Sequence, residues 1–345
     1  MRGSCEDFCP EQEAKLRTKE RLIHYFELKD GQKNVAGTLV KSFSRSAAGV
    51  KRPKPQDLRT ERCLQRTVEH LLKNILLDKR KPYNQVYDFI FDRLRAVRQE
   101  IVMQEYNATQ TIKLIEPMIL FLAYSRYRLC EESMDHFDTK ICEQHLQECL
   151  KRVLCCYDEI AFNNRTQDCT LREIRNRNFI EVLYQLFNLG SIEALRRTTQ
   201  LSKDIRNDPL FAASYTIAIS HFQGNIYRVL TGINKLPHIL CAITSIKLQH
   251  FRRQLYEIFA YAYNNKQLPV SVDFLCRLTN YTSEHDLFAD CKYYNLAITP
   301  NRKGVYFVKN NFNQDVATLK ERYENIVEEK LKKIYLPEVL LLKKL

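Results

Sequence analysis

The chain has 345 residues, of which 45% are hydrophobic and 28% charged, a composition typical of a folded globular protein with a large core. Its 8 glycines form neither a G-x-G-x-x-G nor a G-x-x-x-x-G-K pattern, which argues against a dinucleotide-binding enzyme or a P-loop ATPase. The formal net charge of +13 favours polyanionic partners, although a basic surface without such a partner is the alternative.

The first residues, 1–7, contain no apolar stretch of the kind found in signal peptides. We therefore expect the 12 cysteines to be reduced, in cytosol or nucleus, and mostly buried as small hydrophobic side chains. No run of about 18 apolar residues occurs anywhere in the sequence, which predicts that no segment inserts into a membrane.

Residues 1–59 are predicted to hold a charged helix from Glu11 to Leu28 and then an extended basic strap. The glycines and prolines of residues 31–58 prevent a long helix there. Residues 41–66 contain eight Lys or Arg against two acidic residues. We expect the strap to lie against the helices, anchored through acidic groups by Arg45 and Arg59.

Residues 60–265 are predicted to form a helical-repeat domain, because apolar residues recur there at helical spacing. The first buried stripe comprises Leu64, Val68, Leu71, Leu72 and Ile75. A second helix follows Pro82, and further helices are expected over residues 109–130, 141–160, 176–189, 191–204, 208–222, 225–232 and 238–264, with Pro117, Gly190, Pro209, Gly224 and Pro237 as breaks or starts. Short connections and missing strand signals indicate stacked helical hairpins, as in an α-solenoid.

Three arginines, Arg93, Arg95 and Arg98, flank the apolar stripe of the second helix. They are placed to pair with carboxylates of neighbouring helices, such as Glu116, or to grip phosphate at the surface. The structural role is the favoured hypothesis, because the stripe beside them must be buried.

Two kinds of site are not supported by the sequence. Cys142, His145 and Cys149 share one helix face but lack the paired C-x-x-C pattern of structural zinc sites, so core packing is favoured and no metal or other cofactor is expected. We also find no nucleophile elbow and no H-E-x-x-H, which predicts that the chain is not an enzyme.

Residues 266–312 show the order helix, helix, strand, loop, strand that is typical of a winged helix. The helices are expected over 270–278 and 283–293, the strands over 296–298 and 305–308. A charged helix from Gln314 to Tyr335 and an apolar tail complete the predicted C-terminal segment, 313–345.

The loop of this predicted winged helix carries Arg302 and Lys303, which we expect to contact nucleic acid together with Lys292 of the second helix. That helix is otherwise acidic, with Glu284, Asp286 and Asp290, and is a poor groove reader. A winged helix that only packs against another protein is the equal alternative.

Five motifs follow one another along the chain: Phe8-Cys9-Pro10-Glu11, Phe43-Ser44-Arg45-Ser46-Ala47, Pro55-Gln56-Asp57-Leu58-Arg59, Asp92-Arg93-Leu94-Arg95-Ala96-Val97-Arg98 and Leu186-Phe187-Asn188-Leu189-Gly190. In type and order they resemble the motifs of the germinal-centre-associated nuclear protein (GANP) and suppressor-of-actin family. The resemblance covers roughly residues 8–310, although Asn178 stands before Phe179 where the family usually has an acidic residue.

This resemblance implies a helical stack that ends in a winged helix, a PCI-type module without enzymatic activity. It also implies a second PCI-domain protein and a small acidic proteasome-lid-type protein as partners. RNA binding in nuclear mRNA export, at the nuclear pore and in the cytoplasm, is the implied function. The chain is similar to short single-module members, so a mitotic scaffold at centrosome and spindle remains the alternative.

Overall fold

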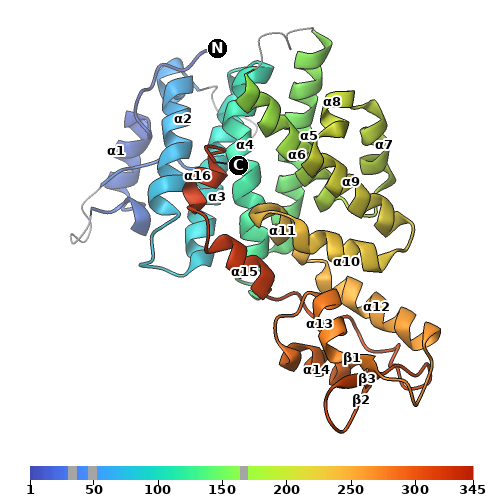
Figure 1. Cartoon of the computed structure of the whole chain (residues 1–345). Coiled ribbons are helices and arrows are strands. Elements are labelled where there is room, and N and C mark those ends of the chain that lie inside the picture. The colour runs from blue at the N-terminus through green and yellow to red at the C-terminus, as the bar shows by residue number, and fades with distance from the viewer. Residues whose placement is uncertain (30–36, 46–52, 164–169, 345) are drawn as a thin grey trace. The chain divides into compact units, whose positions relative to one another are not determined.

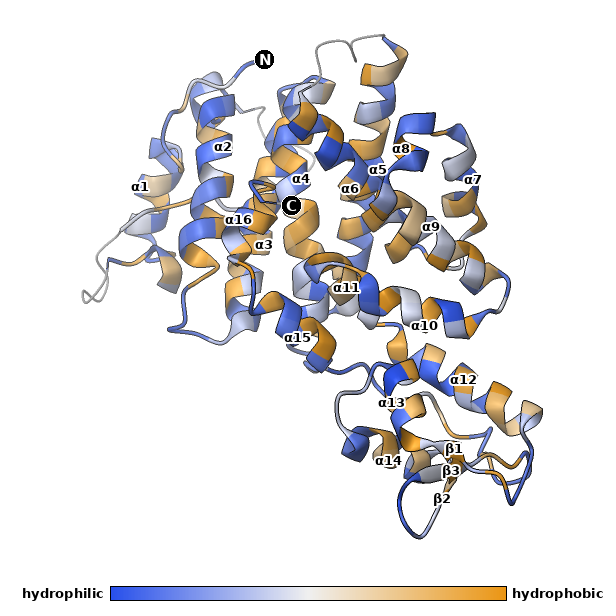
Figure 2. Cartoon of the chain, viewed as in Figure 1, coloured by the Kyte–Doolittle hydropathy of each residue, from blue (hydrophilic) through white to orange (hydrophobic). Residues whose placement is uncertain are grey.

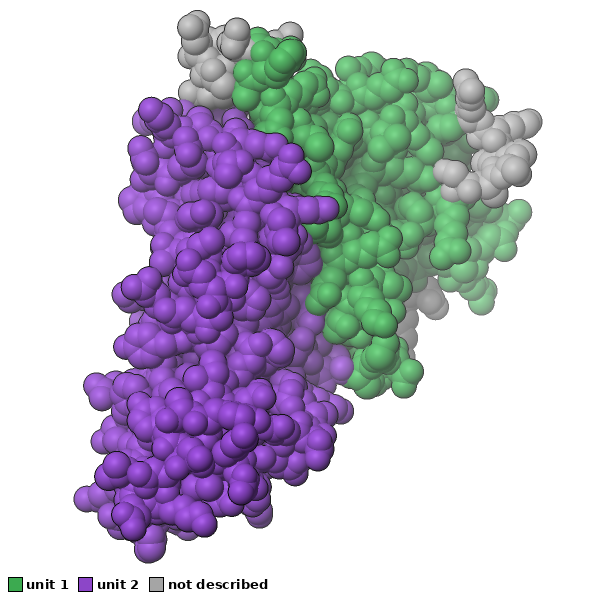
Figure 3. Space-filling model, turned by 90° about the vertical axis from the view of Figure 1, so that its right-hand side faces the viewer, with its two compact units in different colours: residues 1–125, 133–170, 335–345 green, residues 126–132, 171–334 purple. Residues whose placement is uncertain are grey.

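The computed structural model describes residues 1–29, 37–45, 53–163 and 170–344 (Figure 1). These residues are mostly helical, and most helices alternate hydrophobic and hydrophilic residues along the ribbon (Figure 2), as amphipathic helices do. The chain divides into two compact units (Figure 3). Unit 1 comprises residues 1–125, 133–170 and 335–345, and unit 2 comprises residues 126–132 and 171–334.

Unit 1 gathers the N-terminal helices and the C-terminal segment. Its elements are α1 (Glu11–Lys19), two 3-10 helices (Tyr25–Glu27 and Pro55–Asp57), α2 (Glu61–His70), a π-helical turn (Leu71–Ile75), α3 (Tyr83–Met103), α4 (Ala108–Arg128, whose last three residues belong to unit 2), α5 (Thr139–Phe162) and α16 (Leu336–Leu340). Thr60 begins α2 by accepting a hydrogen bond from the Cys63 backbone N–H.

The C-terminal segment belongs to the core of unit 1. The predicted apolar tail contains the helix α16, which packs on the π-helical turn. Val339, Leu340, Leu341 and Leu342 are buried there, and Lys343 pairs with Glu69 at 3.1 Å. Burying these aliphatic side chains stabilises the N-terminal helices.

Unit 2 contains further helices and a small sheet. Its elements are α6 (Leu171–Phe187), α7 (Ile192–Gln200), α8 (Lys203–Asn207), α9 (Pro209–Phe222), α10 (Ile226–Lys235), α11 (His238–Ser245), α12 (Leu248–Ala262), β1 (Val270–Ser271), α13 (Val272–Thr279), α14 (Glu284–Tyr293), β2 (Ala297–Ile298), β3 (Gly304–Tyr306) and α15 (Asn325–Leu331). Asp208 caps α9 by accepting from the N–H groups of Leu210 and Phe211, with Pro209 at the first helical position.

The sheet is antiparallel with strand order β1-β3-β2. Val305 of the central strand is fully buried and faces Val270 on one side and Ile298 on the other. The core beneath the sheet combines residues of α12, α13 and α14, including Tyr256, Leu275 and Leu287. A continuous apolar cluster therefore fixes the β2–β3 hairpin to the helices before it.

Several predicted helix bounds were wrong. The helix expected from Glu11 to Leu28 ends at Lys19, because Arg21 adopts a left-handed backbone conformation with φ 55°. Most of the helix expected from Gln314 to Tyr335 is irregular, and only Asn325–Leu331 is helical.

Three further differences concern helix breaks. The helix expected over 238–264 is interrupted at residues 246–247, where the Lys247 ammonium group donates to the carbonyl of Phe187 at 2.9 Å. The helix expected over 191–204 is divided into α7 and α8. Pro117, considered a break or a start, lies inside α4.

The division at residues 59, 265 and 312 stays a prediction, and residues 46–52 of the strap lie outside the described residues. No helix in the described part of the chain combines the length and the apolar character that a membrane span requires.

Candidate nucleic-acid interface

The loop between β2 and β3, Thr299–Lys303, is held by its own hydrogen bonds. The backbone N–H and hydroxyl of Thr299 pair with the backbone of Gly304, at 2.9 and 3.0 Å. The Asn301 side chain accepts from the Thr299 hydroxyl at 2.7 Å and from the Lys303 backbone N–H at 3.1 Å. Arg302 has a left-handed backbone, with φ 56°. These bonds fix the backbone of the loop and do not involve the side chains of Arg302 and Lys303.

Arg302 and Lys303 are both exposed, and neither pairs with a carboxylate of the described residues. Lys292 is exposed in the last turn of α14 and likewise forms no ion pair with a described residue. The structure thus exposes all three predicted contact residues. Exposed unpaired cations can neutralise phosphates without first breaking an ion pair.

The surface of α14 is less acidic than the sequence suggested. Asp290 is fully buried, and its carboxylate accepts from the hydroxyls of Tyr281 at 2.6 Å and Tyr256 at 3.0 Å. Burial raises the pKa of Asp290, against the effect of these hydrogen bonds. Asp286 lies 4.0 Å from Arg322. Asp290 therefore serves the core beneath the hairpin rather than the surface charge.

A second basic and aromatic surface, not singled out in the sequence, lies where α12 ends. The Lys309 ammonium lies 4.7 Å from the centre of the Tyr261 ring, and the exposed fractions of Tyr261 and Tyr263 are 46% and 52%. Lys266 is also exposed. Interleaved aromatic and basic residues suit the stacking and charge of single-stranded nucleic acid. The interleaving of Tyr261, Tyr263 and Lys266 was a usable sequence signal.

Arg252, which sequence reasoning also missed, anchors the chain after the hairpin. Its guanidinium forms a bidentate ion pair with Glu324 at 2.6 and 2.8 Å and donates to the Thr279 carbonyl at 2.9 Å. The group also lies 3.7 Å from the centre of the Tyr281 ring. Burial opposes the charge, but Glu324 raises the pKa of Arg252. The guanidinium thereby ties α12, the end of α13 and the extended segment before α15 together.

The three arginines of α3 have different surroundings. Arg93 is buried between Asp92 and Glu27, with 3.3 Å to the Glu27 carboxylate. Arg98 pairs with Glu148 at 3.0 Å and contacts the His145 ring nitrogen at 2.8 Å. Both arrangements are the carboxylate pairing that we favoured. Glu116, the suggested carboxylate, accepts a hydrogen bond from the Tyr157 hydroxyl.

The hypothesis of pairing with a carboxylate was wrong for Arg95. Its guanidinium lies 3.8 Å from the centre of the Phe43 ring and has no carboxylate partner among the described residues. Because Phe43 belongs to the strap, Arg95 holds the strap by a cation–π contact rather than by an ion pair. The aromatic partner could not be foreseen, since it lies 52 positions away in the chain.

Of the two residues expected to anchor the strap through acidic groups, Arg59 does so in the described structure. Arg59 is fully buried, and both its side chain and its backbone N–H bind Glu100, at 2.9 to 3.0 Å and 2.7 Å. Lys41 adds a contact to Glu100 at 3.2 Å. Arg45 is exposed and makes no ion pair with a described residue, so Lys41, not Arg45, is the second charged contact of the strap.

Among the described residues, no three metal-binding side chains lie together. Cys142 and Cys149 are buried. His145 contacts Arg98, so its ring is already used.

The sequence was compared with known proteins. The family model of the SAC3/GANP family matches residues 8–300. Protein xmas of Drosophila melanogaster is 30% identical over 214 residues, which is 60% of this chain and 10% of that protein. SAC3 family protein B of Arabidopsis thaliana is 36% identical over 138 residues, 37% of this chain and 8% of that protein.

SAC3 family protein 1 of Schizosaccharomyces pombe is 26% identical over 160 residues, 46% of this chain and 15% of that protein. The matches thus cover only 8% to 15% of the length of these relatives. The family model, by contrast, covers more than half of this chain. On that match, the chain belongs to the SAC3/GANP family.

Proposed function

We propose that the chain is a non-enzymatic scaffold that binds RNA in nuclear mRNA export. The observation that carries the proposal is the exposed β2–β3 loop, where Arg302 and Lys303 have no carboxylate partner in the described structure. The chain that carries this loop belongs to the SAC3/GANP family and has a formal net charge of +13. Such a charge favours a polyanion by counterion release.

The region that presents the loop would be a winged helix of the PCI type. Two helices, α13 and α14, are followed by a β-hairpin, and the sheet is completed by β1 before α13. In such modules the hairpin loop contacts the nucleic-acid backbone. The charge distribution supports this mode, because α14 carries exposed Glu284 and the loop carries two exposed cations.

The proposed partners are a second PCI-domain protein and a small acidic proteasome-lid-type protein, with residence in the nucleus and at the nuclear pore. The partners are those that the resemblance to the family implies, and family membership supports the nuclear location. No feature of the family match or of the described residues favours the mitotic alternative.

The proposal is tested by replacing both loop cations, Arg302→Glu and Lys303→Glu, and titrating single-stranded RNA in a filter-binding assay at several salt concentrations. We expect weaker binding and a log–log salt slope reduced by about 1 for each lost phosphate contact. The matched control is Lys332→Glu with Lys333→Glu, two exposed lysines after α15 with the same change in net charge.

The control separates local contact from overall charge. If the loop contacts RNA, the control binds nearly as wild type. Equal loss in both variants would mean that net charge alone attracts RNA. Unchanged affinity and slope in the loop variant would remove the loop from the site.

A further inference from the structure

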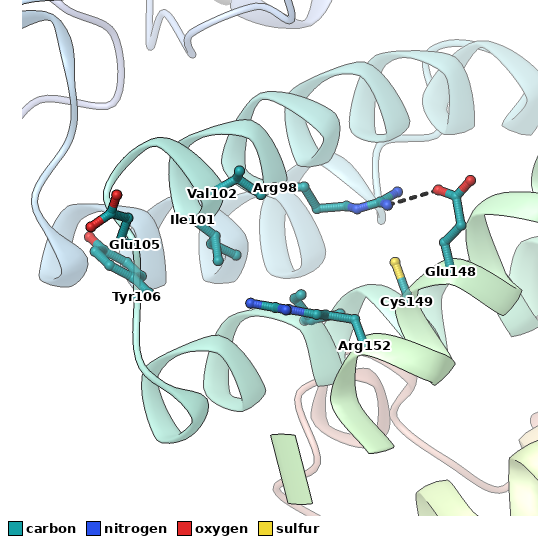
Figure 4. Close-up of a pocket in the computed structure, with 9 residues that line it drawn as sticks. Arg98, Ile101, Val102, Glu105, Tyr106, Glu148, Cys149 and Arg152 are labelled. Atoms are coloured by element: carbon teal, nitrogen blue, oxygen red, sulfur yellow. Dashed lines mark hydrogen bonds and ion pairs between the residues drawn. The ribbon is translucent and has the colours of Figure 1, made fainter. Parts of the chain in front are cut away.

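A pocket with a volume of about 570 Å³ opens in unit 1 between the C-terminal part of α3, α4 and α5 (Figure 4). Nothing in the proposed RNA interface uses it, since that interface belongs to unit 2. The volume is in the range that encloses a large side chain or a small ligand.

The lining of the pocket is mainly apolar. Ile101 of α3 and Ile115 of α4 are buried, and the Cys149 sulfur of α5 points inward (Figure 4). Burial raises the pKa of Cys149 to about 11, so its thiol is neutral and offers no charge to a ligand. An apolar side chain is therefore the group that this lining would accept.

The charges at the pocket are not equivalent. Arg98 is already paired with Glu148 at 3.0 Å. Arg152 is exposed, its guanidinium extends into the pocket, and it forms no ion pair with a described residue (Figure 4). Arg2 adds a second cation, 5.1 Å from the centre of the Tyr106 ring that lines the pocket. Glu105 lies on the rim beside Tyr106 and is the opposing charge.

The apolar surface continues outside the pocket. Val102 is 72% exposed and Met103 is 37% exposed at the end of α3. Adjacent exposed apolar side chains beside a pocket are typical of an interaction surface. Their extent exceeds what a compact small molecule inside the pocket would cover, which favours an extended ligand.

We propose that this pocket docks a short peptide segment of a partner protein, in which an acidic side chain adjoins a large apolar one. The apolar side chain enters between Ile101 and Ile115. The carboxylate binds the Arg152 guanidinium, whose fork geometry fits two oxygens. The remaining peptide lies over Val102 and Met103. This proposal is independent of the RNA interface, since the two use different residues.

The test selects binders from a phage-displayed library of random peptides on the full chain and measures affinities of labelled synthetic copies by fluorescence polarisation. We expect the selected peptides to share an Asp or Glu next to Leu, Phe or Met. Arg152→Glu should weaken them at least about tenfold, equal to ~1.4 kcal/mol. A peptide whose acidic residue is replaced by Lys should prefer this variant to wild type.

The matched control is Lys151→Glu, which changes the same charge at the neighbouring exposed position outside the pocket. It should leave the affinity nearly unchanged. Thermal melting checks the fold, and Arg152→Gln gives the same direction with a smaller loss should the reversal unfold the chain. No shared motif among the selected peptides, undiminished binding to Arg152→Glu, or equal loss with Lys151→Glu would each overturn the proposal.

Discussion

Arg252 and Glu324 lie 72 positions apart and form a bidentate ion pair with both side chains buried. The pair joins α12 to the extended segment that precedes α15. The Glu324 carboxylate also lies 3.9 Å from the Arg322 guanidinium. The stability of unit 2 therefore depends on charges that are removed from water.

Arg252→Met should destabilise the protein by on the order of 3–5 kcal/mol, because it leaves the Glu324 carboxylate buried without its main partner. The free energy of unfolding is measured in urea by circular dichroism, since the chain has no tryptophan. Adding Glu324→Gln should recover part of the loss. Lys15→Ala, which breaks the exposed pair with Glu11, should cause no measurable change.

The strap offers a test in which two arginines behave differently. Arg59→Ala leaves the buried Glu100 carboxylate with Lys41 as its one charged partner among the described residues, so the strap should detach more often. We expect faster chymotrypsin cleavage after Phe43 or Leu58. Arg45→Ala should leave the cleavage pattern as in wild type, because Arg45 is exposed and unpaired in the described structure. Identical digestion of both variants would contradict this assignment of the anchor.

The sequence predicted the helical character well because apolar periodicity reflects burial on one helix face. Its errors arise where tertiary contacts override local propensity. Residues 314–324 are charged enough to suggest a helix, but Glu324 is held in an extended segment by Arg252. No local pattern indicates a partner 72 positions away.

The candidate interface was predictable only in part. The turn-forming residues around Arg302 and Lys303 mark an exposed loop, and the structure exposes both side chains. The prediction that α14 presents an acidic surface was wrong for Asp290, which is buried. Its position three residues after Leu287 places both on one helix face, a signal of burial that the charge obscured.

Arg93 and Arg95 should differ in their effect on stability. Arg93→Ala removes a buried partner of Glu27, but Arg17 still pairs with that carboxylate, so we expect a loss of about 2 kcal/mol, below that of an abandoned buried charge. Arg95→Ala removes a cation–π contact with Phe43 and should cost about 0.5–1 kcal/mol. Melting temperatures in the opposite order would show that Arg95 carries an interaction beyond this contact.

The stability of unit 2 should depend on pH through His221. Burial lowers the pKa of His221 below its ordinary value of 6.5, with help from Lys247 and His250. The folded state then binds fewer protons than the unfolded state. The resulting stability is present above pH 6.5 and is lost as the pH falls through the lowered pKa.

His221→Gln removes this contribution, so the variant should lose less stability than wild type between about pH 7.5 and about pH 5. The free energy of unfolding is measured in urea at both pH values. For each protein, the value at the lower pH is subtracted from the value at the higher pH, so that the packing cost of the substitution cancels. His285→Gln, at an exposed position of α14, is measured in parallel as the matched substitution of a second histidine. An unaltered dependence in the His221 variant would rule His221 out as its source.

The shape of the β2–β3 hairpin can be separated from its charge at Gly304. A Cβ atom added there would lie 2.6 Å from the Pro269 Cβ, so Gly304→Ala must displace β3 from the chain before β1. We expect the free energy of unfolding to fall by roughly 1–3 kcal/mol from overpacking, together with weaker RNA binding through displacement of the loop.

The loop double-Glu variant should instead weaken RNA binding while melting as wild type, because Arg302 and Lys303 stabilise nothing by ion pairing in the described structure. Introducing Pro269→Gly as well removes the clashing atom, so Gly304→Ala should cost less in that background than in wild type. Equal costs in both backgrounds would show that the contact with Pro269 is not what requires glycine at position 304.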